Sequence, residues 1–410
     1  MSAATTTQLT VQDSLKAVTI VDCDTHPMVR PAELADHVAE PFRTRYFMDR
    51  LHEVDANTSL YTPPKQTTMG TAVPPGGGTP GSDPAFYKQQ VLAEAGADYA
   101  FLIFLLPKTR FVDPAYDAAV FAAHNRWMTE TWLSTSGHNA EGRLRGSLRV
   151  SPYAAEAAAA EIDTWAGHPF VSQIYLVPEN PDPLGAPQFH PLYAAAARAG
   201  LPIAMHVTGR PGQFNLTPTG FPGYHLETFT QWPLYFMTNL ASLVFEGVFE
   251  KFPELQIVFV EGGFSWAAPF IWRLDRIWAE LRSEVPLCRR KPSDYVRDHL
   301  HFTTQPVEEP ADRAHLRQAM EWGDAADRLL FASDYPHYDF DSPAWVTTRI
   351  PKADRQRIMA GNAVELFGLP SHRRADAIDD ARAAFLADPV RAVIERPRMD
   401  ASRYFPEQED

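Results

Sequence analysis

The chain has 410 residues, of which 45% are hydrophobic and 21% charged, the composition of an ordinary globular protein. Its formal net charge of -14 at pH 7 argues against a nucleic-acid partner and against binding to an anionic membrane surface. Its two cysteines, Cys23 and Cys288, make no disulfide framework, and it has neither a run of about 18 apolar residues nor a secretory signal at its start. We therefore expect a cytoplasmic protein.

Short β-rich runs alternate with helix-compatible stretches along the chain. Strict alternation of strand and helix favours a parallel sheet, and strands that are apolar throughout suit a sheet buried on both faces. Eight such units predict a (β/α)8 TIM barrel, and no G-x-G-x-x-G motif follows a strand to indicate a dinucleotide-binding fold. The expected strands lie within residues 17–26, 98–107, 143–152, 170–178, 201–209, 255–263, 299–306 and 328–337.

The composition of the remaining segments predicts how the chain is organised around this barrel. Residues 1–15 are expected to be a mobile N-terminal segment and residues 16–370 the barrel domain. Within it, residues 52–90 are predicted to be an inserted loop, because they contain the sequence "PPGGGTPGSDP". Residues 371–410 are predicted to form a C-terminal helical extension and a charged tail.

The first predicted strand ends in an unusual run of polar residues, "IVDCDTHP". Because side chains alternate along a strand, Asp22, Asp24 and His26 should point to the same side. Inward-facing polar groups are costly without a partner, so Asp24 and His26 are expected to share one. Asp22, one layer deeper, is expected to support them.

Three more strands end in an ionisable residue: His206 ends the fifth, Glu261 the sixth and Asp334 the eighth. Taken singly, His206 could be a hydrogen-bonded core histidine, Asp334 a cap of the following turn, and Glu261 a brace for the turn at "EGG". In a barrel, however, the carboxyl ends of the strands meet at one face and carry the active site. A shared metal ion accounts for all of these residues at once, and histidine nitrogens with carboxylate oxygens suit zinc, manganese or iron(II).

Four motifs, in chain order, resemble those of a known family: "VDCDTHP", "PIAMHVTG", "FPELQIVFVEGGFSWAAPFIWRLD" and "LLFASDYPHYD". Over residues 17–370 the chain resembles the amidohydrolase superfamily, in particular the amidohydrolase-related branch that includes aminocarboxymuconate-semialdehyde decarboxylase and the resorcylate decarboxylases. The resemblance implies a metal ion held by four residues, with the last of them alternatively acting as general base for a metal-bound water. These four residues are Asp24, His26, His206 and Asp334. Multimers are frequent in this family.

Glu261 departs from the family pattern, because the decarboxylases end the sixth strand with a histidine that takes part in proton transfer. A glutamate there could act as a general acid or base if burial raises its pKa. It could instead orient His206, or bind a second metal together with His225. Whether the site binds one metal ion or two therefore stays open. Two ions would have six ligands of the kind that suits a dinuclear iron or manganese centre, namely Asp24, His26, His206, His225, Glu261 and Asp334.

The sequence thus predicts a metal-dependent enzyme that hydrolyses or decarboxylates a small, polar, carboxylate-bearing substrate, with Glu261, Asp334 or His225 as the catalytic groups. The alternative enzyme is an O2-dependent hydroxylase with an iron or manganese centre on the same barrel. The alternative without catalysis is a barrel subunit of a hetero-oligomer. Either a homo-oligomer or a hetero-oligomer with a related chain is expected, and no organic cofactor. His337 and Asp339 could orient the ligands, and Gln305 could touch the substrate.

Overall fold

The computed structural model describes residues 19–49, 68–105, 113–208 and 224–371, and these ranges contain one eight-stranded sheet. The strands are parallel and follow one another around the sheet in chain order. Each lies inside the range predicted for it, so the predicted TIM barrel is confirmed. The strands are β1 (Val21–Thr25), β2 (Tyr99–Leu102), β3 (Leu144–Arg149), β4 (Val171–Leu176), β5 (Ile203–His206), β6 (Ile257–Val260), β7 (Leu300–Thr303) and β8 (Leu329–Leu330).

The last strand returns to the first. The backbone N–H of Cys23 donates to the carbonyl of Phe331 at 2.9 Å, and the N–H of Asp334 donates to the carbonyl of Asp24 at 3.0 Å. Just beyond β8, Tyr335 forms a parallel bridge with Thr25. The ends of β1 and β8, which come from opposite ends of the chain, therefore lie side by side.

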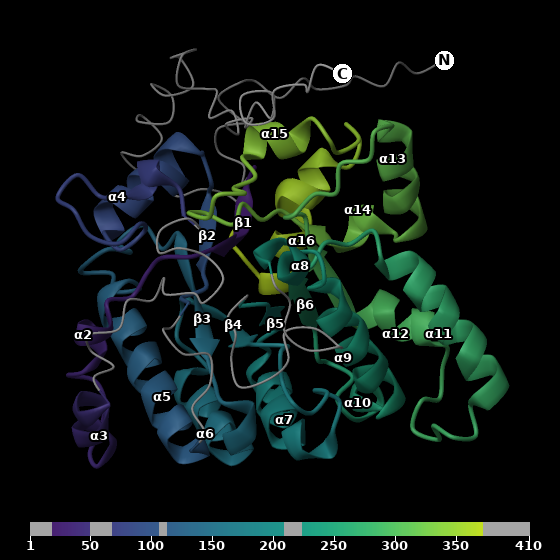
Figure 1. Cartoon of the computed structure of the whole chain (residues 1–410), viewed down its shortest axis with the longest axis horizontal. Helices are drawn as coiled ribbons and strands as arrows, with labels where there is room; N and C mark the ends of the chain where they lie inside the picture. The colour runs from purple at the N-terminus through teal and green to yellow at the C-terminus, as the bar shows by residue number, and fades with distance from the viewer. Residues whose placement is uncertain (1–18, 50–67, 106–112, 209–223, 372–410) are drawn as a thin grey trace, which may run out of the picture.

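Helices surround the strands, which occupy the middle of the molecule (Figure 1). Helix α5 shows how the sequence starts them: the carboxylate of Asp113 accepts hydrogen bonds from the N–H groups of Ala115 and Tyr116, and a proline takes the first helical position. The helices that flank the strands are α5 (Pro114–Thr131), α6 (Ala155–Trp165), α7 (His190–Ala199), α9 (Pro233–Phe245), α11 (Ala267–Leu281), α12 (Pro292–His299), α13 (Arg313–Trp322) and α16 (Asn362–Phe367). Shorter helices are α2 (Pro31–Leu34), α3 (Phe42–Met48), α4 (Pro84–Lys88), α8 (His225–Phe229), α10 (Val248–Lys251), α14 (Ala325–Arg328) and α15 (Pro343–Thr347).

The strands are buried on both faces, and successive residues belong to different apolar clusters. In β5, Ile203 and Met205 pack among residues of helices α6, α7 and α9. Ala204 lies in a separate cluster with residues of β1, β2, β4, β6 and β8 and of α16. Because side chains alternate along a strand, His206 shares the face of Ala204 and so points away from the helix layer. This alternation turns the predicted site residues toward one another.

Part of the predicted inserted loop packs beside the barrel end that carries the site. Thr68 bridges His337, and the N–H of Met69 donates to the carbonyl of Pro336 at 2.8 Å. Gly81 has a φ of +72°, and a Cβ there would lie 3.1 Å from the carbonyl oxygen of His26, so this close approach requires glycine. Residues 1–15, the first part of the loop and nearly all of 371–410 lie outside the described residues, and these domain limits stay predictions. Within the described ranges, no helix is both long and apolar enough to cross a membrane.

Candidate metal centre

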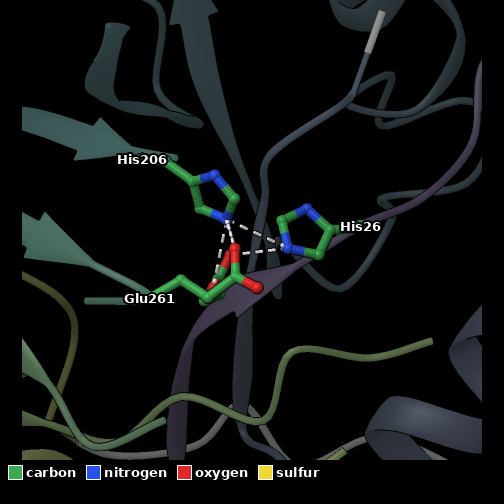
Figure 2. Close-up of side chains that lie close together, drawn as sticks. His26, His206 and Glu261 are labelled. Atoms are coloured by element: carbon green, nitrogen blue, oxygen red, sulfur yellow. Dashed lines mark hydrogen bonds and ion pairs between the residues drawn. The ribbon is translucent and has the colours of Figure 1, made fainter. Parts of the chain in front are cut away.

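Four predicted site residues meet at one point. Asp24 lies in β1, His26 directly after it, His206 ends β5 and Glu261 directly follows β6. Each offers one ligand atom, and these atoms lie within 4.8 Å of one another. None of the four side chains is more than 5% exposed. Figure 2 shows the imidazoles of His26 and His206 and the carboxylate of Glu261 pointing toward one another.

The Nε2 atom of His26 is at the centre of this arrangement. It lies 3.2 Å from Asp24 Oδ1, 2.9 Å from Asp334 Oδ1 and 3.2 Å from the Nε2 atom of His206. The Nε2 atom of His206 in turn lies 3.1 Å from Glu261 Oε2 and 3.4 Å from Asp24 Oδ2. Two imidazole nitrogens and three carboxylates therefore face the same small volume.

The hydrogen bonds around the centre fit a bound cation. Both oxygens of Asp24 are buried and accept no hydrogen bond. The Nδ1 atom of His26 lies 2.8 Å from the carbonyl oxygen of Ile103, a contact that places a proton on Nδ1 and turns Nε2 toward the centre. Orphaned carboxylate oxygens beside such a nitrogen form a donor set for manganese, iron(II) or zinc.

The charges also favour a positive ion at this point. Burial lowers the pKa of His26, but the carboxylates of Asp24 and Asp334 outweigh it and hold that pKa well above its usual range. Burial raises the pKa of Asp24, yet His26 and His206 hold it below its usual range. The carboxylates thus stabilise a positive charge next to Nε2 of His26, and either a proton or a metal ion can supply it.

Glu261 has the opposite tendency. Burial, then the nearby charges of Asp334 and Asp24, raises its pKa well above the usual range. Burial and the neighbouring carboxylates therefore favour the protonated form of this side chain over the charged form. This is the property that the sequence analysis required of a glutamate acting as a general acid.

Asp334 links the centre to a second group of polar side chains. Its Oδ1 atom lies 2.5 Å from Nδ1 of His337. The amide nitrogen of Gln305 donates to Oδ2 of Asp334 at 3.2 Å and to Oδ2 of Asp339 at 2.9 Å. His337 therefore contacts Asp334 directly and Asp339 contacts it through Gln305, while their role in orienting the ligands stays a prediction. Glu261, Asp334 and Asp339 form a further group that could hold a cation, again within 4.8 Å.

Backbone geometry places two of these carboxylates. Among the described residues, Glu261 (φ 62°) and Asp334 (φ 60°) are two of the three non-glycine residues with positive φ. Strained residues of this kind concentrate at functional sites. Beyond Glu261, a Cβ on Gly262 would lie 2.1 Å from the ring of Phe236, so the chain turns here only with glycine.

Asp22 supports this geometry from below. Its Oδ1 atom accepts a hydrogen bond from the N–H of Ser333 at 2.9 Å. Burial raises the pKa of Asp22 to about 7. This hydrogen bond links Asp22 to the residues that follow β8, and its predicted supporting role stays a prediction.

One predicted ligand falls outside what the structure describes. His225 begins helix α8, but its side chain lies outside the described part of the chain. Its predicted roles as a ligand of a second ion and as a catalytic group stay predictions.

Sequence reasoning missed two residues at the centre. The hydroxyl of Thr303 accepts a hydrogen bond from the N–H of Glu261 at 3.0 Å, and the ring of Tyr175 packs edge-on against His206 with centroids 5.8 Å apart. The run "FTTQP", which begins within β7 and continues past its end, marked the region of Thr303. Nothing in the sequence distinguishes Tyr175 from other strand aromatics.

Known proteins resemble this chain in both sequence and fold. The sequence model of the family described as "Amidohydrolase" matches residues 21–369. A gamma-resorcylate decarboxylase from Polaromonas sp. is 33% identical over 136 residues, which are 32% of this chain and 40% of that protein. A gamma-resorcylate decarboxylase from Rhizobium sp. is 28% identical over 190 residues, 45% of this chain and 55% of that protein. The alignments thus span only about half, or less, of these relatives.

Solved structures match over a longer stretch. The 5-carboxyvanillate decarboxylase of Sphingomonas paucimobilis has a TM-score of 0.62 at 21% identity, covering 86% of this chain and all of that one. A dihydroxybenzoic acid decarboxylase of Polaromonas sp., solved with manganese and 2-nitroresorcinol, has a TM-score of 0.59 at 18% identity, covering 85% and 97%. At these identities the likeness establishes the fold.

Proposed function

The chain belongs to the amidohydrolase family, and from that premise we propose that it is a metal-dependent decarboxylase that removes a carboxylate from a small aromatic acid as carbon dioxide. The observation that carries the proposal is the buried meeting point of Asp24, His26, His206 and Glu261. The decarboxylase names of the relatives support this reaction class. Manganese is the first candidate for the ion, because two of the similar decarboxylases were solved with it.

Asp24, His26, His206 and Asp334 would hold the ion, which leaves Glu261 beside it as a proton donor. When bound, it would supply a positive charge that anchors an anionic oxygen of the substrate and polarises it. The protein's part is to keep the ligand atoms in place, and it does this through the Ile103 carbonyl behind His26 and the Gln305 amide behind Asp334. Burial of all these side chains excludes water from the reacting groups.

Decarboxylation replaces a carbon–carbon bond by a carbon–hydrogen bond, so the ring carbon must receive a proton. We assign its delivery to Glu261, a buried carboxyl group that faces the same small volume as the ligand atoms and whose pKa is raised above its usual range by burial and by the nearby carboxylates. The carbon takes the proton from Glu261. The bond to the carboxylate then breaks with its electron pair returning to the ring, and carbon dioxide leaves. A proton from solvent restores Glu261.

The second carboxylate group favours one other candidate. Glu261, Asp334 and Asp339 lie close enough together to hold an additional cation, and a centre rich in carboxylates suits a pair of iron or manganese ions. An O2-dependent hydroxylase is therefore the alternative function. It requires uptake of oxygen, whereas the decarboxylase requires none.

The test is turnover of 2,6-dihydroxybenzoate and 5-carboxyvanillate by metal-free and manganese-loaded protein, with and without oxygen. We expect carbon dioxide and the decarboxylated phenol from the loaded protein alone, at the same rate in the presence and absence of oxygen. His206→Ala and Asp334→Asn should lose turnover but keep a native circular dichroism spectrum. His190→Ala serves as the matched control, because His190 is a histidine at the start of α7 that contacts Lys251 at 2.8 Å and is not among the grouped site residues.

Two results would overturn the proposal: full turnover by protein stripped of metal, or no product from either acid. Oxygen uptake with a hydroxylated product would instead support the alternative. The predicted oligomeric state is not addressed by this experiment and stays a prediction.

A further inference from the structure

Helix α4 and the segment after it contact both ends of the chain at the candidate metal centre. The helix continues directly into a π-helical segment, Gln89–Glu94. Tyr87 and Gln90 are three residues apart on this continuous helix, so their side chains extend to the same side. Tyr87 is fully buried, and helix α4 lies near the end of β1 (Figure 1). π-helical turns are frequent at functional sites, so the partners of these two side chains matter.

Tyr87 contacts the residue between two predicted metal ligands. Thr25 lies between Asp24 and His26 in the chain. Its hydroxyl donates to the carbonyl of Phe101 at 2.6 Å and lies 2.6 Å from the hydroxyl of Tyr87. A threonine hydroxyl has one proton, and Thr25 uses it for Phe101, so Tyr87 must donate to Thr25. The Tyr87 hydroxyl therefore fixes the side chain that separates the two ligands.

Gln90 holds the residue that follows the ligand from the other end of the chain. That residue is Tyr335, directly after Asp334. The Tyr335 hydroxyl donates to Oε1 of Gln90 at 2.5 Å, and Nε2 of Gln90 donates to the carbonyl of Thr71 at 3.0 Å. The second hydrogen bond sets the orientation of the amide, so its oxygen faces the tyrosine. The carbonyl of Tyr335 in turn accepts a hydrogen bond from the N–H of His26 at 2.6 Å.

The two sides of the centre need such an external support. Nε2 of His26 lies 2.9 Å from Oδ1 of Asp334, although the two residues come from opposite ends of the chain. Asp334 has a φ of 60°, and a residue in this conformation persists only where the surrounding contacts fix it. The rings of Tyr87 and Tyr335 pack edge-on with their centroids 5.5 Å apart. One helical segment therefore holds both neighbours of the ligands and also packs them together.

We propose that Tyr87 and Gln90 are positioning residues that fix the β1 ligands relative to Asp334 and thereby set the affinity for the metal ion, an inference that rests on the metal centre of the proposed function. Residues that orient metal ligands without touching the ion typically contribute about 10- to 100-fold to its affinity. Without the two hydrogen bonds, the same ligands are present but less fixed before the ion binds, and ordering them then opposes binding. The segment that carries both residues lies outside the repeating strands and helices of the barrel.

The experiment is a manganese titration of the full-length protein, without substrate, followed by electron paramagnetic resonance. Tyr87→Phe and Gln90→Met keep the size of each side chain and remove its hydrogen bond to the barrel. Each should weaken manganese binding about 10-fold or more. The spectrum of the bound manganese should also be broader than in the wild-type protein, because the ligands are held less uniformly.

Thr25 provides the direct check on the Tyr87 contact. Thr25→Val should weaken binding as Tyr87→Phe does, and the double variant should bind no more weakly than Thr25→Val alone, because both changes remove the same hydrogen bond. Thr25→Ser keeps the hydroxyl and should bind manganese within about threefold of the wild-type protein.

Tyr46→Phe is the matched control. The Tyr46 side chain is also buried, and its hydroxyl donates to the carbonyl of Pro31 in α2 at 2.9 Å. Its loss should lower the melting temperature of the metal-free protein about as much as Tyr87→Phe does, and should leave the manganese affinity unchanged. A purely structural role for Tyr87 would give the two variants the same affinity.

The inference is overturned if Tyr87→Phe and Gln90→Met bind manganese within about twofold of the wild-type protein, if Tyr46→Phe weakens binding as much as they do, or if the wild-type protein binds no manganese. Its failure differs from failure of the proposed function. Selective loss of manganese affinity in a protein that never decarboxylates supports the inference and removes the function. Decarboxylation by the wild-type protein with unchanged affinity in both variants does the reverse.

Discussion

Replacing Glu261 by glutamine tests the proposed proton donor. The glutamate is 4% exposed, its Oε2 lies 3.1 Å from His206, and its N–H is held by the hydroxyl of Thr303. Glutamine has the same length and branching, so the positive φ at this position adds no strain that glutamate does not already bear. The substitution therefore removes the transferable proton and preserves the shape of the site.

The expected effect is large on turnover and small on stability. A positioned general acid contributes about 10²- to 10⁴-fold to a rate, which is roughly 3 to 5 kcal/mol of activation free energy. Burial and the charges of Asp334 and Asp24 raise the pKa of Glu261, so the metal-free fold disfavours the charged form that glutamine removes. A neutral amide then changes the free energy of unfolding of the metal-free protein by less than about 1 kcal/mol.

The assay is the turnover number for decarboxylation of 2,6-dihydroxybenzoate, with manganese content measured on the same samples. Glu308→Gln is the control: the Glu308 carboxylate accepts hydrogen bonds from the N–H groups of Phe264 and Ser265 beside the same turn. It should lower the melting temperature with little effect on turnover. A Glu261→Gln enzyme with turnover within about twofold of wild-type would refute the assignment. Loss of manganese from Glu261→Gln would show that the residue acts mainly as a ligand.

Three further outcomes are expected. Chelation of the metal should lower the melting temperature of the protein. Manganese added at about 100 times its Kd should then restore about 2.7 kcal/mol of unfolding free energy. An unchanged melting temperature would contradict a metal site in the folded protein. Because the pKa of His124 is lowered to about 3 from 6.5, its contribution to stability is present above pH 6.5 and lost as pH falls toward 3. Between pH 7 and 5, wild-type should lose about 2 kcal/mol more than His124→Gln in chemical denaturation, and equal losses would contradict this. Gln305→Leu removes the hydrogen-bond donor shared by Asp334 and Asp339 and should weaken manganese binding about 10- to 100-fold in a metal titration. An unchanged manganese affinity would show that the amide does not orient Asp334.

The residues at the strand ends show how far sequence alone can go. Asp24, His26, His206 and Asp334 are ionisable residues at the ends of apolar runs, a pattern visible without coordinates because parallel barrel strands are otherwise apolar. The structure brings all four together with Glu261. Alternation within β1 does not predict the place of Asp22, because the pairing of β1 with β2 shifts in register between Asp22 and Thr25.

Other features depended on contacts between segments far apart in the chain. No local sequence pattern predicts that Gln305 bridges Asp334 and Asp339, because the bridge requires the ends of β7 and β8 to be adjacent. The raised pKa of Glu261 likewise depends on burial and on carboxylates that come from other parts of the chain. Charge and burial of this kind are properties of the assembled site.

By itself the sequence determined the barrel, since strand and helix periodicities are local, and it identified the strand ends that carry ionisable groups. Only the tertiary structure decided which atoms face one another and that the pKa of Glu261 is raised above its usual range. The physical reason is that a distance or a pKa depends on every neighbour, whereas a periodicity depends only on the order of residues along the chain.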